Sequence, residues 1–150
     1  MYNDRILPFD LDSEEAVLGS CFIDFEAIAK VADFLLPGDF YREKNQWTFE
    51  AMLKLYKEGK PTNQIIVAHE LAKTKKLEAV GGAPYISHCI SQTPTSVHVR
   101  YYAEIVKDCS ARRKLIRESH RNINKAYDET KPLRKRGGIN LGVNNICDAR

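Results

Sequence analysis

The sequence lacks the residue groupings on which most enzymes and metal proteins depend. Its four cysteines form no CxxC pair and have no histidine at a metal-ligand spacing; they are scattered at Cys21, Cys89, Cys109 and Cys147. The four histidines fall on separate segments, and no serine or cysteine lies on a nucleophile-elbow pattern. We therefore expect free thiols, no metal site and no catalytic residues, so that the chain by itself is not an enzyme.

Long apolar runs are missing as well. The amino terminus, "MYNDRILPFDLDSEE", has no apolar run of signal-peptide length, and no later segment approaches the roughly 20 apolar residues of a membrane span. The formal net charge of +3 is too small to require a nucleic-acid or membrane partner. We predict a cytoplasmic protein with reduced cysteines and no membrane partner.

The double glycine in "LEAVGGAPYI" does not belong to a phosphate-binding loop. Neither GxxxxGK[ST] nor GxGxxG is present around Gly81 and Gly82. Pro84 suits the first turn of a helix, so the pair is interpreted as a corner between two helices.

Helical periodicity fills the rest of the chain, and 43% hydrophobic residues are enough for a core. One helix is predicted to begin with Asp12 as its cap, and a second begins with Asp24 and continues to Pro37-Gly38. A third helix covers "REKNQWTFEAMLKLYKEG". In the fourth, "QIIVAHELAKTKKL", the predicted apolar face comprises Ile65, Ile66, Ala68, Leu71 and Ala72.

These patterns predict an all-α fold, in which a compact multi-helix globular bundle is followed by a long protruding helix. The expected divisions are residues 1–98 for the bundle, 99–130 for the long helix, and 131–150 for a basic tail rich in glycine and asparagine, expected to be disordered.

One face of the long helix carries a seam, that is, a narrow row of mostly apolar residues that recur in alternating three- and four-residue steps. The seam begins at Val99, Tyr102 and Val106 and continues through the self-association candidates Cys109, Arg113, Ile116, His120, Ile123 and Tyr127. One interpretation is a pairing helix. The other is that the first half belongs to the core and the second half is a solvated basic stem.

Basic residues concentrate in the same region and favour a nucleic-acid partner as the alternative function. The candidates for a small helical nucleic-acid-binding protein are Arg112, Arg117, Arg121, Arg134, Lys135 and Arg136. Acidic residues such as Glu104, Asp108 and Glu118 interleave with them, which favours a solvated face of mixed charge.

Several separate sequence blocks together carry a family resemblance through their order and spacing. They are "EEAVLGS", "DFY", "FEAMLKLY" with "GKP", "LEAVGG", "TPTS", "YYAEIV" and "RRKLI". Over about residues 5–127 the chain closely resembles the N-terminal domain of bacterial replicative DNA helicases of the DnaB type. The resemblance implies a collar domain whose long helix is the first arm of a helical hairpin. Such hairpins pair between subunits, so that a hexamer contains dimers of this domain, and the collar docks primase.

The resemblance also implies which residues and partners to expect. The primase-facing positions would be Tyr85 and Ile116, with Asp12 as a weaker candidate; packing for the first two and capping for Asp12 are the alternatives. A helicase loader is a further expected partner, and DNA is expected through the parent protein. ATP and Mg²⁺ would act in a separate motor domain, so no cofactor is expected in this chain.

The chain departs from the family pattern after about Thr130. A second amphipathic helix is expected there, but "KPLRKRGGINLGVNNICDAR" disfavours a regular helix. We interpret this segment as a truncated or frameshifted end, and we expect self-association weaker than in the family.

Overall fold

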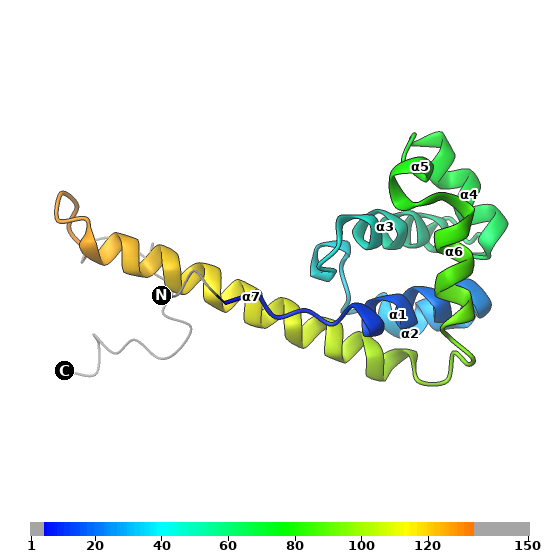
Figure 1. Cartoon of the computed structure of the whole chain (residues 1–150), viewed down its shortest axis with the longest axis horizontal. Helices are drawn as coiled ribbons and strands as arrows, with labels where there is room; N and C mark the ends of the chain where they lie inside the picture. Colours follow the sequence, from blue (N-terminus) through cyan, green and yellow to red (C-terminus); the bar gives the residue numbers. More distant parts are fainter. Residues whose placement is uncertain (1–4, 134–150) are drawn as a thin grey trace. The chain divides into compact units, whose positions relative to one another are not determined.

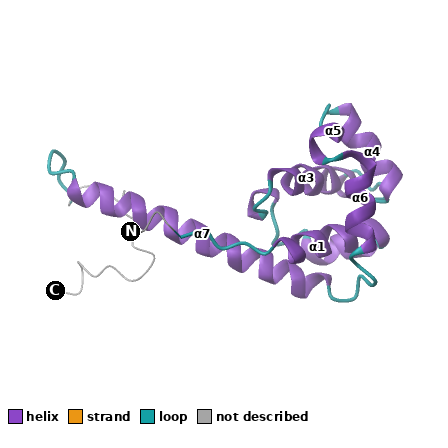
Figure 2. Cartoon of the chain, viewed as in Figure 1, coloured by secondary structure: helices purple, strands orange, loops and turns teal. Residues whose placement is uncertain are grey.

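The computed structural model describes residues 5–133, and this part of the chain contains helices and no strands (Figure 2). The α-helices are α1 (Leu11–Ile23), α2 (Phe25–Val31), α3 (Glu43–Lys57), α4 (Gln64–Lys73), α5 (Leu77–Val80), α6 (Gly82–Ser91) and α7 (Val99–Tyr127), with a 3-10 turn, η2 (Pro37–Asp39), before α3. The predicted all-α class and the long last helix are confirmed. The predicted tail lies outside the described residues from position 134 onward.

The chain divides into two compact units within α7. One unit is Pro8–Ser110, and the other combines the described residues 5–7 with 111–133. The sequence predicted a division at 98/99, whereas these two units divide after Ser110. The reason is that the first three turns of α7 bury Val99, Ala103 and Val106 in the core of the first unit.

In the first unit, α1 packs against α2, α3 and α6, while α3 also packs against α4 and α5 (Figure 1). The core is apolar and includes Leu18, Ile28, Phe40, Phe49 and Ile86. Gly19 makes the close approach of α1 to α6 possible, because a Cβ at this position would lie 2.4 Å from the Cys89 carbonyl oxygen.

The start of α1 differs from the prediction by two residues. Asp10, not Asp12, is the N-cap: its backbone is extended and its carboxylate accepts a 3.0 Å hydrogen bond from the Ser13 amide. Asp12 is instead an exposed residue of the first turn. The prediction for the second helix was correct at its start, since the Asp24 carboxylate accepts from the Glu26 amide at 2.9 Å.

Two other predictions about helices need correction. The second helix stops at Val31 rather than at Pro37, and Leu36 is extended, as expected for a residue before proline. On α4 the buried residues are Val67, Glu70 and Leu71, whereas Ile65 is 70% exposed. Glu70 can occupy an inward position because Lys54 pairs with its carboxylate.

The glycine corner is confirmed. Gly81 and Gly82 adopt φ values of 110° and 66°, the left-handed region that glycine occupies without a Cβ clash. Gly81 ends α5 and Gly82 begins α6, so the pair forms the turn between the two helices. Pro84 lies in the first turn of α6, as predicted.

Candidate functional site

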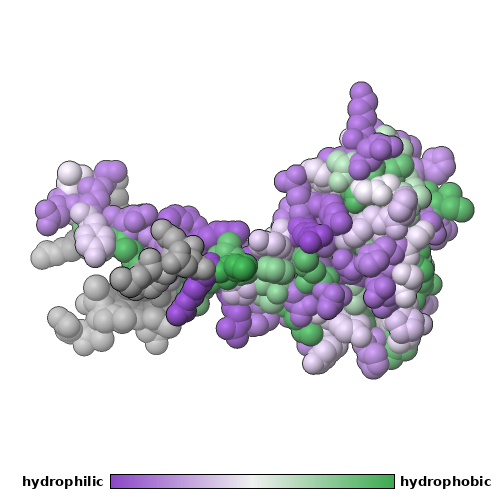
Figure 3. Space-filling model, in the orientation of Figure 1, coloured by the Kyte–Doolittle hydropathy of each residue, from purple (hydrophilic) through white to green (hydrophobic). Residues whose placement is uncertain are grey.

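The candidate site is a groove in the second unit, where residues 5–7 lie beside the second half of α7. Its volume is about 590 Å³, and it is lined by Arg5, Ile6, Leu7, Ile116, Arg117, His120 and Arg121. Figure 3 shows apolar surface bordered by hydrophilic side chains along this part of the chain. The groove therefore combines a largely apolar floor with a basic border.

The residues of the predicted seam become more exposed along α7 from its first half to its second half. Val99 and Val106 are buried, and Tyr102 and Cys109 are half-buried. Farther on, Ile116 and His120 are half-buried as well, but Ile123 is 42% exposed and Tyr127 is 83% exposed. The first part of the seam is core, as one of the two interpretations proposed, and the distal part leaves large apolar side chains uncovered.

Arg113 is the exception among the self-association candidates. It is only 3% exposed, and a side chain so buried offers another subunit almost no surface. Ile116 and His120 lie together in the groove, and Ile123 and Tyr127 follow them on the same seam. The structure thus brings four of the six candidates together along one stripe of the helix.

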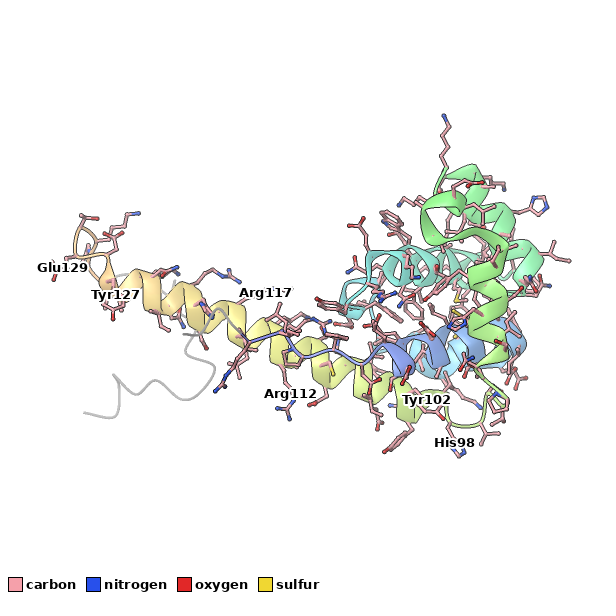
Figure 4. The ribbon with its side chains drawn as sticks, in the orientation of Figure 1. His98, Tyr102, Arg112, Arg117, Tyr127 and Glu129 are labelled. Atoms are coloured by element: carbon pink, nitrogen blue, oxygen red, sulfur yellow. The ribbon has the colours of Figure 1, made fainter. Side chains whose placement is uncertain are left out.

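Of the nucleic-acid candidates, the three that the structure describes do not all lie on one side of α7. Arg112 and Arg117 point away from opposite sides of α7 (Figure 4). Arg117 and Arg121, four residues apart, both line the groove. Arg134, Lys135 and Arg136 lie outside the described residues.

Tyr85, a predicted primase-facing residue, lies in the core of the first unit and is 9% exposed. Its hydroxyl donates to the Asn45 side-chain oxygen, and the Asn45 amide donates at 2.8 Å to Glu14. The Lys44 ammonium lies 3.7 Å from the centre of the Tyr85 ring. Burial raises the pKa of Tyr85 well above its ordinary value of 10, so the hydroxyl stays protonated and donates.

The chain of contacts from Tyr85 ends at the N-terminus of α3. The Glu14 carboxylate accepts from the amides of Tyr41 at 2.7 Å and Arg42 at 3.4 Å. These two residues precede α3, so a side chain of α1 satisfies donors that the helix itself leaves unpaired. Tyr85 therefore helps to fix the packing of α1, α3 and α6. Ile116 lies in the groove and Asp12 is exposed; the assignment of all three to primase stays a prediction.

Sequence reasoning missed Arg5, Ile6 and Leu7 as site residues. They precede the first predicted helix and carry no periodic signal, and their partners lie about a hundred positions away in the sequence. The one available signal was two adjacent apolar residues between an arginine and a proline, in "RILP", outside any predicted core.

The described residues 5–133 contain no group of three His, Cys, Asp or Glu side chains that could hold a metal ion. No helix in this part of the chain combines the length and apolar composition needed to cross a membrane. Cys21 and Cys89 are buried, and burial raises the pKa of their thiols to about 12 and about 11. Cys109 is half-buried, and Cys147 lies outside the described residues.

Comparison with known proteins gives consistent matches. Residues 6–108 match the model of the DnaB-like helicase N-terminal domain. The chain is 40% identical over 117 residues to the replicative DNA helicase DnaB of Geobacillus stearothermophilus, covering 78% of this chain and 26% of that protein. It therefore spans about a quarter of the length of this relative.

Two solved structures share the fold. The N-terminal domain of DnaB helicase from Mycobacterium tuberculosis is 39% identical with a TM-score of 0.80, over 81% of this chain and 87% of that one. The corresponding domain from Helicobacter pylori, which interacts with primase, is 25% identical with a TM-score of 0.66, over 77% of this chain and 89% of that one. The resemblance noted in the sequence is confirmed: the chain belongs to the family of DnaB-like helicase N-terminal domains.

Proposed function

We propose that this domain serves subunit assembly and primase docking in a hexameric replicative DNA helicase. In this role it acts in the cytoplasm through protein contacts, whereas ATP, Mg²⁺ and DNA are handled elsewhere in the parent protein. A helicase loader is a further partner. The Helicobacter pylori relative, which interacts with primase, supports the docking part of the proposal.

The observation that carries the proposal is the uncovered apolar stripe of α7. Ile123 and Tyr127 remain exposed on the same seam whose earlier residues are packed in the core. Covering an apolar side chain of this size contributes about 1.5–3 kcal/mol, so water-exposed positions of this kind favour association.

The assembly role is tested by the solution mass of the chain, measured by light scattering over a concentration series. We expect a dimer at high concentration that the Ile123→Asp, Tyr127→Asp variant abolishes. Tyr101→Asp is the matched control, because Tyr101 is an exposed tyrosine of α7 outside the seam. A chain that is monomeric at every concentration, or a dimer that the double variant leaves intact, would contradict the assembly role.

Primase docking is tested by titration calorimetry with the C-terminal domain of a primase. Ile116→Asp is expected to abolish binding because it places a charge in the groove. Tyr85→Phe removes only the buried hydroxyl and keeps the ring, so unchanged primase binding would show that the hydroxyl makes no contact with primase. No binding by the unaltered chain would contradict the docking role.

The alternative, nucleic-acid binding through the distal helix, has less support. Its arginines lie on both sides of α7, and those that line the groove surround apolar side chains (Figure 4). Binding to single-stranded DNA whose logarithmic affinity falls linearly with logarithmic salt concentration would favour it.

A further inference from the structure

The groove has the size and composition of a site for apolar side chains. Its volume of about 590 Å³ lies within the range of ordinary binding pockets. Ile6, Leu7 and Ile116 supply apolar surface from two distant segments, and Ile6 is 79% exposed. An isoleucine left so open next to other apolar side chains indicates a surface that a partner can cover.

The charge of the groove narrows the choice of partner. Arg5, Arg117 and Arg121 all line it. From Ala111 to Arg121 the chain carries five Lys and Arg residues and one Glu. From residue 122 to 133, by contrast, two lysines are balanced by one Asp and one Glu. Within the described residues 111–133, the excess of positive charge therefore lies in the segment that lines the groove, where Arg113 is buried and the other basic residues are exposed.

A second copy of the chain is a poor occupant of this groove. Two such segments placed face to face would oppose arginines across the contact, and like charges at an interface are unfavourable. The charge-balanced segment beyond Arg121, with Ile123 and Tyr127, suits self-association better.

Nucleic acid is also a poor occupant. Arginines match phosphates, but binding of single strands relies on aromatic side chains on which bases stack. The residues that line the groove in the described part of the chain include no Phe, Tyr or Trp. Phosphate contacts alone would leave Ile6 and Ile116 uncovered.

We propose that the groove binds an amphipathic helix of a partner protein, with apolar residues against Ile6, Leu7 and Ile116 and acidic residues opposite Arg5, Arg117 and Arg121. Such a helix matches the apolar floor and the basic border at the same time. This inference rests on the proposed docking function and adds the chemistry of the docked segment.

The test uses the full chain and synthetic helical peptides of about 18 residues, roughly five turns. All peptides carry leucines at i, i+4 and i+7; the flanking positions are Glu in one, Gln in the second and Lys in the third. Fluorescence anisotropy should show that the Glu peptide binds at least about tenfold more tightly than the Gln peptide, and that the Lys peptide binds most weakly.

A charge exchange identifies the residues responsible. Arg117→Glu, Arg121→Glu should weaken binding of the Glu peptide at least about tenfold and improve binding of the Lys peptide. The control is Arg112→Glu, Lys57→Glu, which changes the net charge equally but alters the other side of α7 and the end of α3 (Figure 4). The control should change either affinity by less than about twofold.

The outcomes separate this inference from the proposed function. Primase binding that is unaffected by the charge reversal would overturn the inference and leave docking intact. Selective binding of the Glu peptide without primase binding would sustain the inference and contradict primase docking. Equal affinity for the three peptides, or single-stranded DNA binding lost in the Arg117→Glu, Arg121→Glu variant, would overturn the inference.

Discussion

Residues 8–110 and residues 111–133 belong to the same continuous stretch of chain and share α7, yet they differ in how far their side chains are buried. The first region encloses a large apolar core, although Ile65 and Val97 are 70% exposed, and some of its charged groups, such as Glu14 and Asp39, are buried with partners. Among the described residues no buried side-chain nitrogen or oxygen lacks a hydrogen bond. The second region has no such core: residues 111–133 bury no apolar side chain, and Leu115, Ile123 and Tyr127 are exposed.

This difference in burial indicates that the first region provides the stability of the domain and that the second provides surface for association. A region with an enclosed apolar core and paired buried polar groups is held together by its own contacts. A region that leaves apolar groups in water next to a basic groove has surface to offer a partner. Substitutions in the first should change the free energy of unfolding, and those in the second should change association.

The largest expected change in the free energy of unfolding comes from replacing an aromatic residue with alanine, a substitution that can be made in both regions. Phe49→Ala should lower the free energy of unfolding by about 4 kcal/mol, because it opens a cavity in a fully buried site. Tyr127→Ala should change it by less than about 0.5 kcal/mol, because this side chain is mostly in water. Urea unfolding followed by circular dichroism measures both. Similar losses for the two variants would mean that the regions do not differ as described.

The next effect tests the buried polar network. Glu14→Ala should cost about 3 kcal/mol, since the amides of Tyr41 and Arg42 and the side chain of Asn45 would lose their shared acceptor. The same urea titration measures it. Glu50→Ala, an exposed position on α3, is the control and should be nearly neutral. A neutral Glu14→Ala would show that the network does not hold α1 to α3.

Asp39 should give the first region a dependence on acid pH. Burial opposes its charge, but hydrogen bonds from Ser110, the Leu36 amide and Lys107 outweigh burial and lower the pKa below the ordinary 3.8. Because the folded pKa is the lower one, the stabilisation is complete above about pH 4 and is lost as pH falls through the folded pKa.

Asp39→Asn tests that dependence. It should cost about 2 kcal/mol at neutral pH through weakened hydrogen bonds to a charged group. Between pH 4 and pH 2 it should also reduce the slope of the free energy of unfolding against pH, measured by urea titration at each pH. An unchanged slope would contradict the assignment to Asp39.

The smallest effect concerns the cap of α1. Asp10→Ala should cost about 1 kcal/mol because the Ser13 amide loses its acceptor. Asp12→Ala should cost less than about 0.5 kcal/mol, because Asp12 only favours the helix dipole from an exposed first-turn position. Thermal unfolding of the two variants distinguishes them. A larger loss for Asp12→Ala would restore the cap predicted from the sequence.

Local features of the sequence predicted much of the fold. Asp24 begins a helix, Gly81 and Gly82 turn a corner, and the alternating steps after Val99 form one long helix, since each depends on neighbouring residues alone. The predictions that were wrong concern positions where the local sequence allows two alternative structures. Both Asp10 and Asp12 could cap α1, and the apolar residues of α4 fit more than one inward face, so tertiary packing decided the outcome.

The sequence by itself therefore determined the all-α class, the long α7 and the seam along it, because helix propensity, capping and periodicity act over a few residues. Only the tertiary structure decided that Tyr85 is buried with Asn45 and that Ile6 and Leu7 meet Ile116 in a groove. Those contacts join residues that are 40 or more positions apart in the sequence. Such residues meet only when the chain between them folds, so no pattern of neighbouring residues can predict the contact.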